Sequence, residues 1–163
     1  MADTTSVPVA AAQSVVTTDQ LPNLFISACL DGEAQAVVGG GTPIEFGALP
    51  SALRGHLGKP DKAQVWMIDG AEPAYLYALS YTDRSFSPKI CGVASENLSI
   101  RPAAAAVELR LTGRNVLNPT PSKSTEWLND EVGYRALATR KGGYTILQVN
   151  WLNENQTEAP PTQ

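Results

Sequence analysis

The chain has 163 residues, of which 43% are hydrophobic and 17% charged, and its formal net charge is −4 at pH 7. This length is typical of one domain and is enough to bury a core. No apolar run approaches the roughly 20 residues that a membrane-spanning helix needs, so we expect a soluble protein. Residues 1–50 contain no Lys or Arg, and the later basic residues form no stripe or patch. Nucleic acids and anionic membrane surfaces are therefore not expected as partners.

Both ends of the chain are polar or small-residue tracts, which bury too little surface to offset the cost of ordering. We predict a disordered arm over residues 1–18, a single folded domain over 19–152 and a disordered tail over 153–163. No internal repeat or linker divides the folded part. No signal peptide is visible at the start, although an exported protein lacking its leader would begin in this way.

Three helices are predicted from the spacing of apolar residues. The first covers the residues between Asp19, which can cap it, and Asp31. Its apolar side chains recur three and four residues apart, as on one face of an amphipathic helix: Leu21, Leu24, Phe25, Ala28 and Cys29. A second, short helix is predicted over about 50–57 and a third over about 99–112. The alternation within residues 107–111 would also suit a strand.

Five strands are predicted from alternating or continuous apolar runs. Three of them, over 64–69, 74–81 and 89–94, follow one another through short connections and should pair antiparallel. The other two, over 134–140 and 144–151, flank a Gly-Gly pair that supplies the positive φ of a tight hairpin.

Two stretches, 39–43 and 114–126, are rich in small, polar or proline residues and are predicted as loops. The order of the elements is then ααβββαββ. We expect an α+β fold in which about five antiparallel strands form one sheet and the helices cover one of its faces, because this arrangement buries the apolar stripes.

The two cysteines, Cys29 and Cys91, are too far apart in sequence for a C-x-x-C redox or zinc motif. Each lies on a predicted inward-facing position, one in a helix and one in a strand, so a disulfide between them is geometrically easy. Closing a loop of about 60 residues would stabilise the fold by about 4 kcal/mol. A disulfide favours a compartment outside the cytoplasm. The alternative is two separate buried thiols.

Catalytic and metal-binding patterns are sparse. His56 is the only histidine, and its place near the end of a short helix suits a solvent-facing residue that interacts with the helix dipole. One histidine and two paired cysteines do not make a typical zinc site. No catalytic residue, metal or cofactor is therefore predicted.

The strand over 74–81 is rich in aromatic residues. Tyr75, Tyr77 and Tyr81 share one face of it, and the preceding strand adds Trp66. If the helices cover the opposite face, these four residues form an open surface for a ligand or a protein partner. The alternative is that the tyrosine face is the core side of the sheet.

A short pattern of residues carries a resemblance to other proteins. Residues 25–32 (FISACLDG), then Leu49-Pro50 and Ile90-Cys91-Gly92-Val93, resemble small exported alphaproteobacterial proteins of uncharacterised function. Those proteins pair a helix cysteine of the F-x-x-x-C type with a strand cysteine. The resemblance implies export and the disulfide, and it brings no catalytic residues with it.

The sequence therefore predicts a non-enzymatic binding or interaction domain, periplasmic or secreted. The alternative is an enzyme or small-ligand carrier with a pocket between the sheet and the 114–126 loop. A polar pocket converging on His56 and carboxylates would favour the alternative, and an open tyrosine and tryptophan face without a pocket would favour the binding domain.

Overall fold

The computed structural model describes residues 16–30, 41–71, 73–82, 89–111, 115–118, 124–129 and 133–151. Its helices are α2 (Leu21–Phe25), which runs on as the π-helical turn η3 (Ile26–Leu30), α3 (Ser51–Leu57) and α4 (Ile100–Arg110). Two short 3-10 turns, η2 (Thr18–Gln20) and η5 (Phe46–Ala48), precede α2 and α3. None of the described helices is long and apolar enough to cross a membrane.

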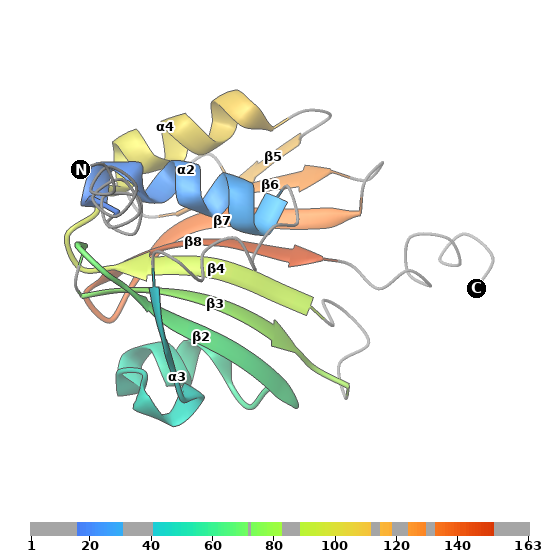
Figure 1. Cartoon of the computed structure of the whole chain (residues 1–163). Helices are drawn as coiled ribbons and strands as arrows, with labels where there is room; N and C mark the ends of the chain where they lie inside the picture. The colour runs from blue at the N-terminus through green and yellow to red at the C-terminus, as the bar shows by residue number, and fades with distance from the viewer. Residues whose placement is uncertain are drawn as a thin grey trace, which may run out of the picture.

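Eight strands form one antiparallel sheet, in the spatial order β1-β2-β3-β4-β8-β7-β6-β5 (Figure 1). The strands are β1 (Gly41–Ile44), β2 (Lys62–Ile68), β3 (Ala74–Ser80), β4 (Lys89–Ser95), β5 (Asn115–Asn118), β6 (Ser124–Asn129), β7 (Tyr134–Lys141) and β8 (Tyr144–Trp151). The α+β class and the antiparallel pairing agree with the sequence-based prediction.

The chain builds the sheet in two halves. A first run of neighbouring strands, β1 to β4, follows α2, and a second run, β5 to β8, follows α4. The second run starts at the far edge and returns to the centre, where β8 pairs with β4. Each half is thus a helix followed by a four-stranded meander, with α3 inserted between β1 and β2.

Helices α2 and α4 contact each other and cover the same face of the sheet (Figure 1). The first turn is closed by a hydrogen bond of 3.0 Å from the Thr17 N–H to Gln20 Oε1, which satisfies one of the helix-start groups. Leu21 and Phe25 of α2 are fully buried, and α4 contributes small side chains such as Ala103. These side chains form one core with the side of the strands that carries Leu76.

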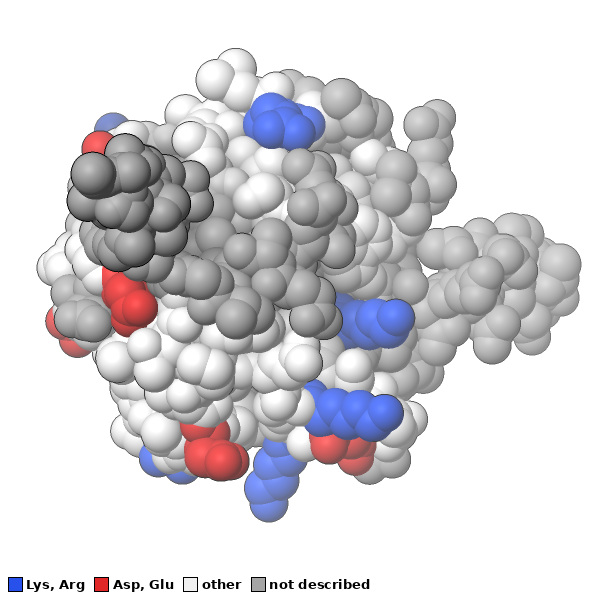
Figure 2. All heavy atoms as spheres, in the orientation of Figure 1, with Lys and Arg blue, Asp and Glu red and all other residues white. Residues whose placement is uncertain are grey.

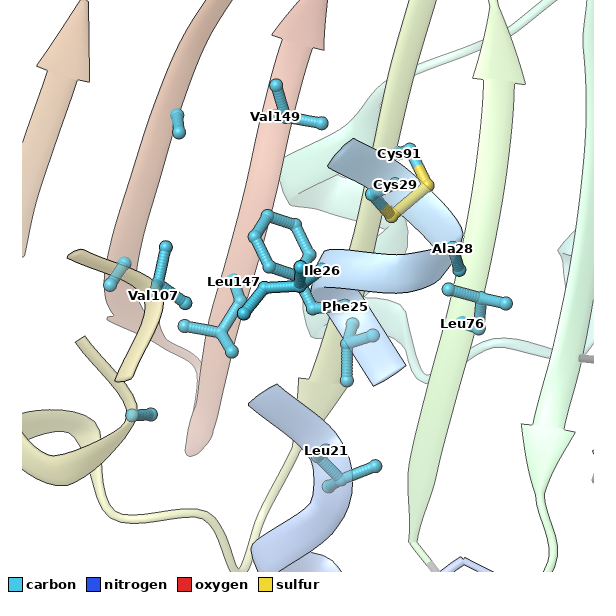
Figure 3. Close-up of a cluster of buried hydrophobic side chains, with 14 of the residues drawn as sticks. Leu21, Phe25, Ile26, Ala28, Cys29, Leu76, Cys91, Val107, Leu147 and Val149 are labelled. Atoms are coloured by element: carbon cyan, nitrogen blue, oxygen red, sulfur yellow. A yellow bond between two sulfur atoms is a disulfide. The ribbon is translucent and has the colours of Figure 1, made fainter. Parts of the chain in front are cut away.

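The disulfide between Cys29 and Cys91 is present, which confirms that prediction. It joins the end of η3 to the central strand β4, with the two Cα atoms 5.4 Å apart (Figure 3). The end of this helix is therefore held against the sheet by a covalent bond as well as by packing.

The prediction that all helices lie on one face is wrong, because α3 packs on the opposite face (Figure 1). Leu53 and Leu57 of α3 are buried there, in one cluster with Tyr77 and Ile146. The physical reason is that the central strands are apolar on both sides: all eight of the residues 90–95, 146 and 147 are buried. A sheet with two apolar faces needs cover on both.

The predicted strand number was too small, because three short strands fall where loops were expected. β1 lies largely within the predicted 39–43 loop, and β5 and the start of β6 lie within the predicted 114–126 loop. β1 contains Pro43, which an edge strand tolerates because its outer side needs no N–H donor. β6 buries alternate residues, but two of these, Thr125 and Asn129, are polar and conceal the pattern.

The described part of the chain begins at residue 16, within the predicted N-terminal arm. The Val16 N–H donates a hydrogen bond of 3.0 Å to the Asp69 carbonyl, three residues before the predicted boundary at residue 19. The rest of the predicted arm and the predicted tail lie outside the described residues.

Candidate functional site

The four aromatic residues predicted as an open binding surface do not form one. Tyr77 and Tyr81 are only 0% and 4% exposed, because they lie beneath α3 in the second core cluster. Tyr75 lies at the margin of that cluster. Trp66 is buried on the opposite face, in the cluster beneath α2 and α4. The tyrosine face is therefore a core face, and the prediction of an exposed aromatic surface is wrong.

A buried polar cluster lies where Tyr77 crosses the middle of the sheet. Its hydroxyl donates a hydrogen bond of 2.7 Å to Gln148 Oε1. It can reach that atom because the intervening residue on β4 is Gly92, where a Cβ would lie 2.5 Å from the hydroxyl oxygen. The amide nitrogen of Gln148 in turn donates to Asn150 Oδ1 at 2.9 Å.

His56 completes this cluster from α3. Its Nε2 lies 3.1 Å from the same Gln148 oxygen, so one side of the half-buried ring faces the sheet, whereas the sequence predicted a solvent-facing residue. Burial lowers the His56 pKa; the hydrogen bond to Gln148 opposes this effect, and Lys141 adds to it. The ring is bonded to a neutral amide, not to a carboxylate that would orient it as a general base.

Burial also shifts the pKa of Tyr77, in this case far above its ordinary value, because the charged phenolate is the form that burial disfavours. We interpret the cluster as the hydrogen-bonded attachment of α3 to the sheet.

A groove opens on the other face, beside the disulfide, with a volume of about 570 Å³. The end of η3 forms one wall through Ala28 and Cys29, and the sheet forms the floor. The floor is hollow because the residues of β3 there are the small Ala78 and Ser80. Small-ligand sites usually have volumes of about 300–1,000 Å³, so this groove is of suitable size.

The register of the strands sets the chemistry of the groove. One row of neighbours runs across β2, β3, β4 and β8, and its members all line the groove: Lys62, Ser80, Lys89 and Trp151. The two lysines are two strands apart, which is a Cα separation of about 10 Å. The next row inward contains Gln64, Ala78 and Cys91. The two lysine ammonium groups therefore flank the Ser80 hydroxyl, and the Trp151 indole and the disulfide provide apolar surface beside them.

Trp151 is held at its place by a second aromatic ring. Tyr134 of β7 meets it edge to face, with ring centroids 5.2 Å apart, a favourable arrangement for an aromatic pair. Trp151 is partly exposed, whereas Trp66 and Trp127 are buried. It is thus the tryptophan whose environment a ligand in the groove would change.

The described residues that line the groove include two ammonium groups, those of Lys62 and Lys89. None of its described lining residues carries a carboxylate. The nearest acidic neighbour in the sequence, Asp61, accepts hydrogen bonds from the backbone N–H and the hydroxyl of Thr82, the latter at 2.8 Å, and these bonds lower its pKa. Figure 2 shows basic side chains at the lower right, over the ends of β2 to β4, with acidic side chains beside them. Two ammonium groups with no carboxylate among the described lining residues would attract an anionic group.

Sequence reasoning missed this groove because its row joins residues from four separate strands. The one available signal was alternation: if Cys91 points inward toward the helix, Lys89 lies on the same side of its strand.

The part of the chain that the structure describes contains no group of His, Cys, Asp or Glu side chains that could hold a metal ion. No family model, no curated protein and no solved structure matches the chain. What can be inferred about the function therefore depends on the groove and its chemistry.

Proposed function

We propose that the chain is an extracytoplasmic binding domain with no catalytic step of its own, and that the groove beside the disulfide holds its ligand. The ligand is an organic anion. Its carboxylate lies between Lys62 and Lys89, near the Ser80 hydroxyl, and its apolar part lies against Ala78 and Trp151.

The row that carries two lysines, a serine and a tryptophan is the single observation that supports this proposal most. A carboxylate accepts charge-assisted hydrogen bonds from ammonium groups. The apolar neighbours add contact area, as is usual in small-ligand sites. The placement outside the cytoplasm is supported by the disulfide, because such bonds persist in oxidising compartments.

The alternative, an enzyme or small-ligand carrier with a pocket between the sheet and residues 114–126, stays a hypothesis. Residues 115–118 and 124–126 belong to β5 and β6, and residues 119–123 lie outside the described ranges. The proposal is based on the groove because its lining residues are described.

The proposal is tested by titrating the protein with hexanoate and following tryptophan fluorescence. We expect a saturable change that is absent in Trp151→Phe. Lys62→Gln and Lys89→Gln should each weaken binding about fivefold, which corresponds to about 1 kcal/mol for a charge pair near the surface.

Two controls make the test specific. Hexanamide has the same chain without the charge and should bind much more weakly. Arg101→Gln removes an exposed charge on α4, outside the groove, and should leave the affinity unchanged. Equal affinity for the acid and the amide, or equal affinity in all variants, would contradict the proposal.

A further inference from the structure

The edge of the sheet next to the groove has a step. β1 pairs only with residues 65–68 of β2, and its last residue, Ile44, lies opposite Val65. β2 extends three residues farther, over 62–64, and these pair with β3 on their inner side. No described strand pairs with their outer side, because the chain leaves the sheet after Ile44 and enters η5.

A second hollow, of about 460 Å³, lies at this step. It is lined on one side by residues 43–46, where β1 ends, and on the other by residues 63–66 of β2. Ala63 and Gln64 line both this hollow and the groove beside the disulfide. All three side chains of residues 62–64 are exposed. The groove and the step therefore adjoin each other at residues 63 and 64, on the edge of β2 that no described strand covers.

We propose that this edge accepts an extended peptide segment as an added strand, with acidic side chains directed toward Lys62 on the neighbouring strand. This inference depends on the proposed function, since it extends the anion site from Lys62 to the edge of the sheet and names a peptide carboxylate as the anion. The unpaired backbone of an edge strand is a template for such addition. Alternation would direct every second side chain of the peptide to the groove face, beside Lys62 and Gln64.

The remaining side chains of the peptide would lie on the opposite face, above Ala63. The neighbours on that face are Ile44 and Phe46, which pack against the second core cluster. Glu45 lies between them in the sequence and also lines the hollow, so the acidic side chains of the peptide must lie nearer to Lys62 than to Glu45. The segment that fits both faces therefore alternates acidic and apolar residues. A second copy of this chain fits less well, because its own edge would bring another Lys62 to the groove face, where like charges repel.

The test uses a seven-residue peptide in which Val and Glu alternate, with binding measured by calorimetry. A peptide of the same composition with its three Glu residues consecutive is the matched control and should bind at least tenfold more weakly. Lys62→Gln should weaken binding of the alternating peptide severalfold, and Arg101→Gln should not.

Backbone pairing is tested with two further peptides, one N-methylated at every Glu and one at every Val. In a strand the N–H groups of alternate residues point to the same side, so methylation of one set should raise Kd at least tenfold while methylation of the other set changes it less than twofold. Peptide binding should also slow amide hydrogen exchange of residues 62–64. If methylation at Glu and methylation at Val have equal effects on Kd, whether both leave binding intact or both abolish it, strand addition is overturned.

The outcomes separate this inference from the proposed function. If hexanoate changes the fluorescence of Trp151 but the alternating peptide does not bind, the groove remains an anion site and the peptide inference fails. If neither binds, both proposals fail.

Discussion

Gly92 is the residue on which the centre of the sheet depends. Because it has no side chain, the ring of Tyr77 can lie across β4 and reach Gln148 on the next strand. That contact brings the buried hydroxyl and amide together with the half-buried imidazole of His56 on α3. Each of these polar groups is costly to bury alone and acceptable when bonded.

Gly92→Ala should therefore destabilise the fold by about 1–3 kcal/mol, the usual cost of overpacking a core. The added methyl would lie 2.5 Å from the Tyr77 hydroxyl oxygen and 2.8 Å from the Leu147 carbonyl oxygen, so the tyrosine must move. Urea unfolding measures the change. Gly55→Ala is the matched control: nothing lies within 4 Å of its added Cβ, and in helix α3 it should stabilise by about 0.5–1 kcal/mol. Unfolding free energies that change alike in both variants would contradict this account.

His56 should make stability depend on pH between about 5 and 8. Its pKa in the folded protein is lowered below the ordinary 6.5 by burial, so the unfolded state binds the proton more readily. The free energy of unfolding should therefore fall as the pH falls through 6.5 and be higher at pH 8.

Urea unfolding at pH 8 and pH 5.5 measures this effect. His56→Gln removes the only histidine and should reduce the difference between the two pH values. A variant with the same pH dependence as the wild type would show that other groups cause it.

At the scale of the elements, the first helix is the one most dependent on a covalent bond. α2 and η3 together are ten residues long, which is too short for a stable isolated helix. Their position depends on the core contacts of residues such as Phe25 and on the disulfide to β4. The same disulfide lines the groove, so the shape of the site and the stability of the helix are linked.

Replacing both cysteines, Cys29→Ala with Cys91→Ala, should lower the free energy of unfolding by about 4 kcal/mol, since the bond closes a loop of 62 residues. The affinity for hexanoate should fall as well, because the wall formed by η3 is no longer fixed. Denaturant unfolding with and without a reductant measures the first effect. The double variant should be insensitive to the reductant, whereas the wild type should lose stability in it. A wild type indifferent to reduction would show that packing alone holds the helix.

At the scale of the whole molecule, the two halves meet at β4 and β8. The central pair there is Gly92 opposite Gln148. The polar cluster bridges this junction, because Tyr77 belongs to the first half and Gln148 to the second. The groove spans it too, with Lys62 and Lys89 from the first half and Trp151 from the second. Both features exist only when the two meanders are joined.

Local patterns in the sequence determined most of the elements. The predicted helices over 50–57 and 99–112 correspond to α3 and α4, and the predicted hairpin corresponds to β7 and β8. The inward positions of Cys29 and Cys91 were also predicted, because helical and strand periodicities act over a few residues and can be read directly.

Tertiary structure alone decided which face each helix covers and which strands are neighbours. Tyr77 and Leu76 are adjacent in sequence and both fully buried, so alternation could not show which of them faces α2. The row of Lys62, Ser80, Lys89 and Trp151 depends on three separate strand pairings. Each pairing is selected by the burial of a whole strand face and not by the residues that line the groove. The site is therefore a consequence of register, which local sequence patterns do not contain.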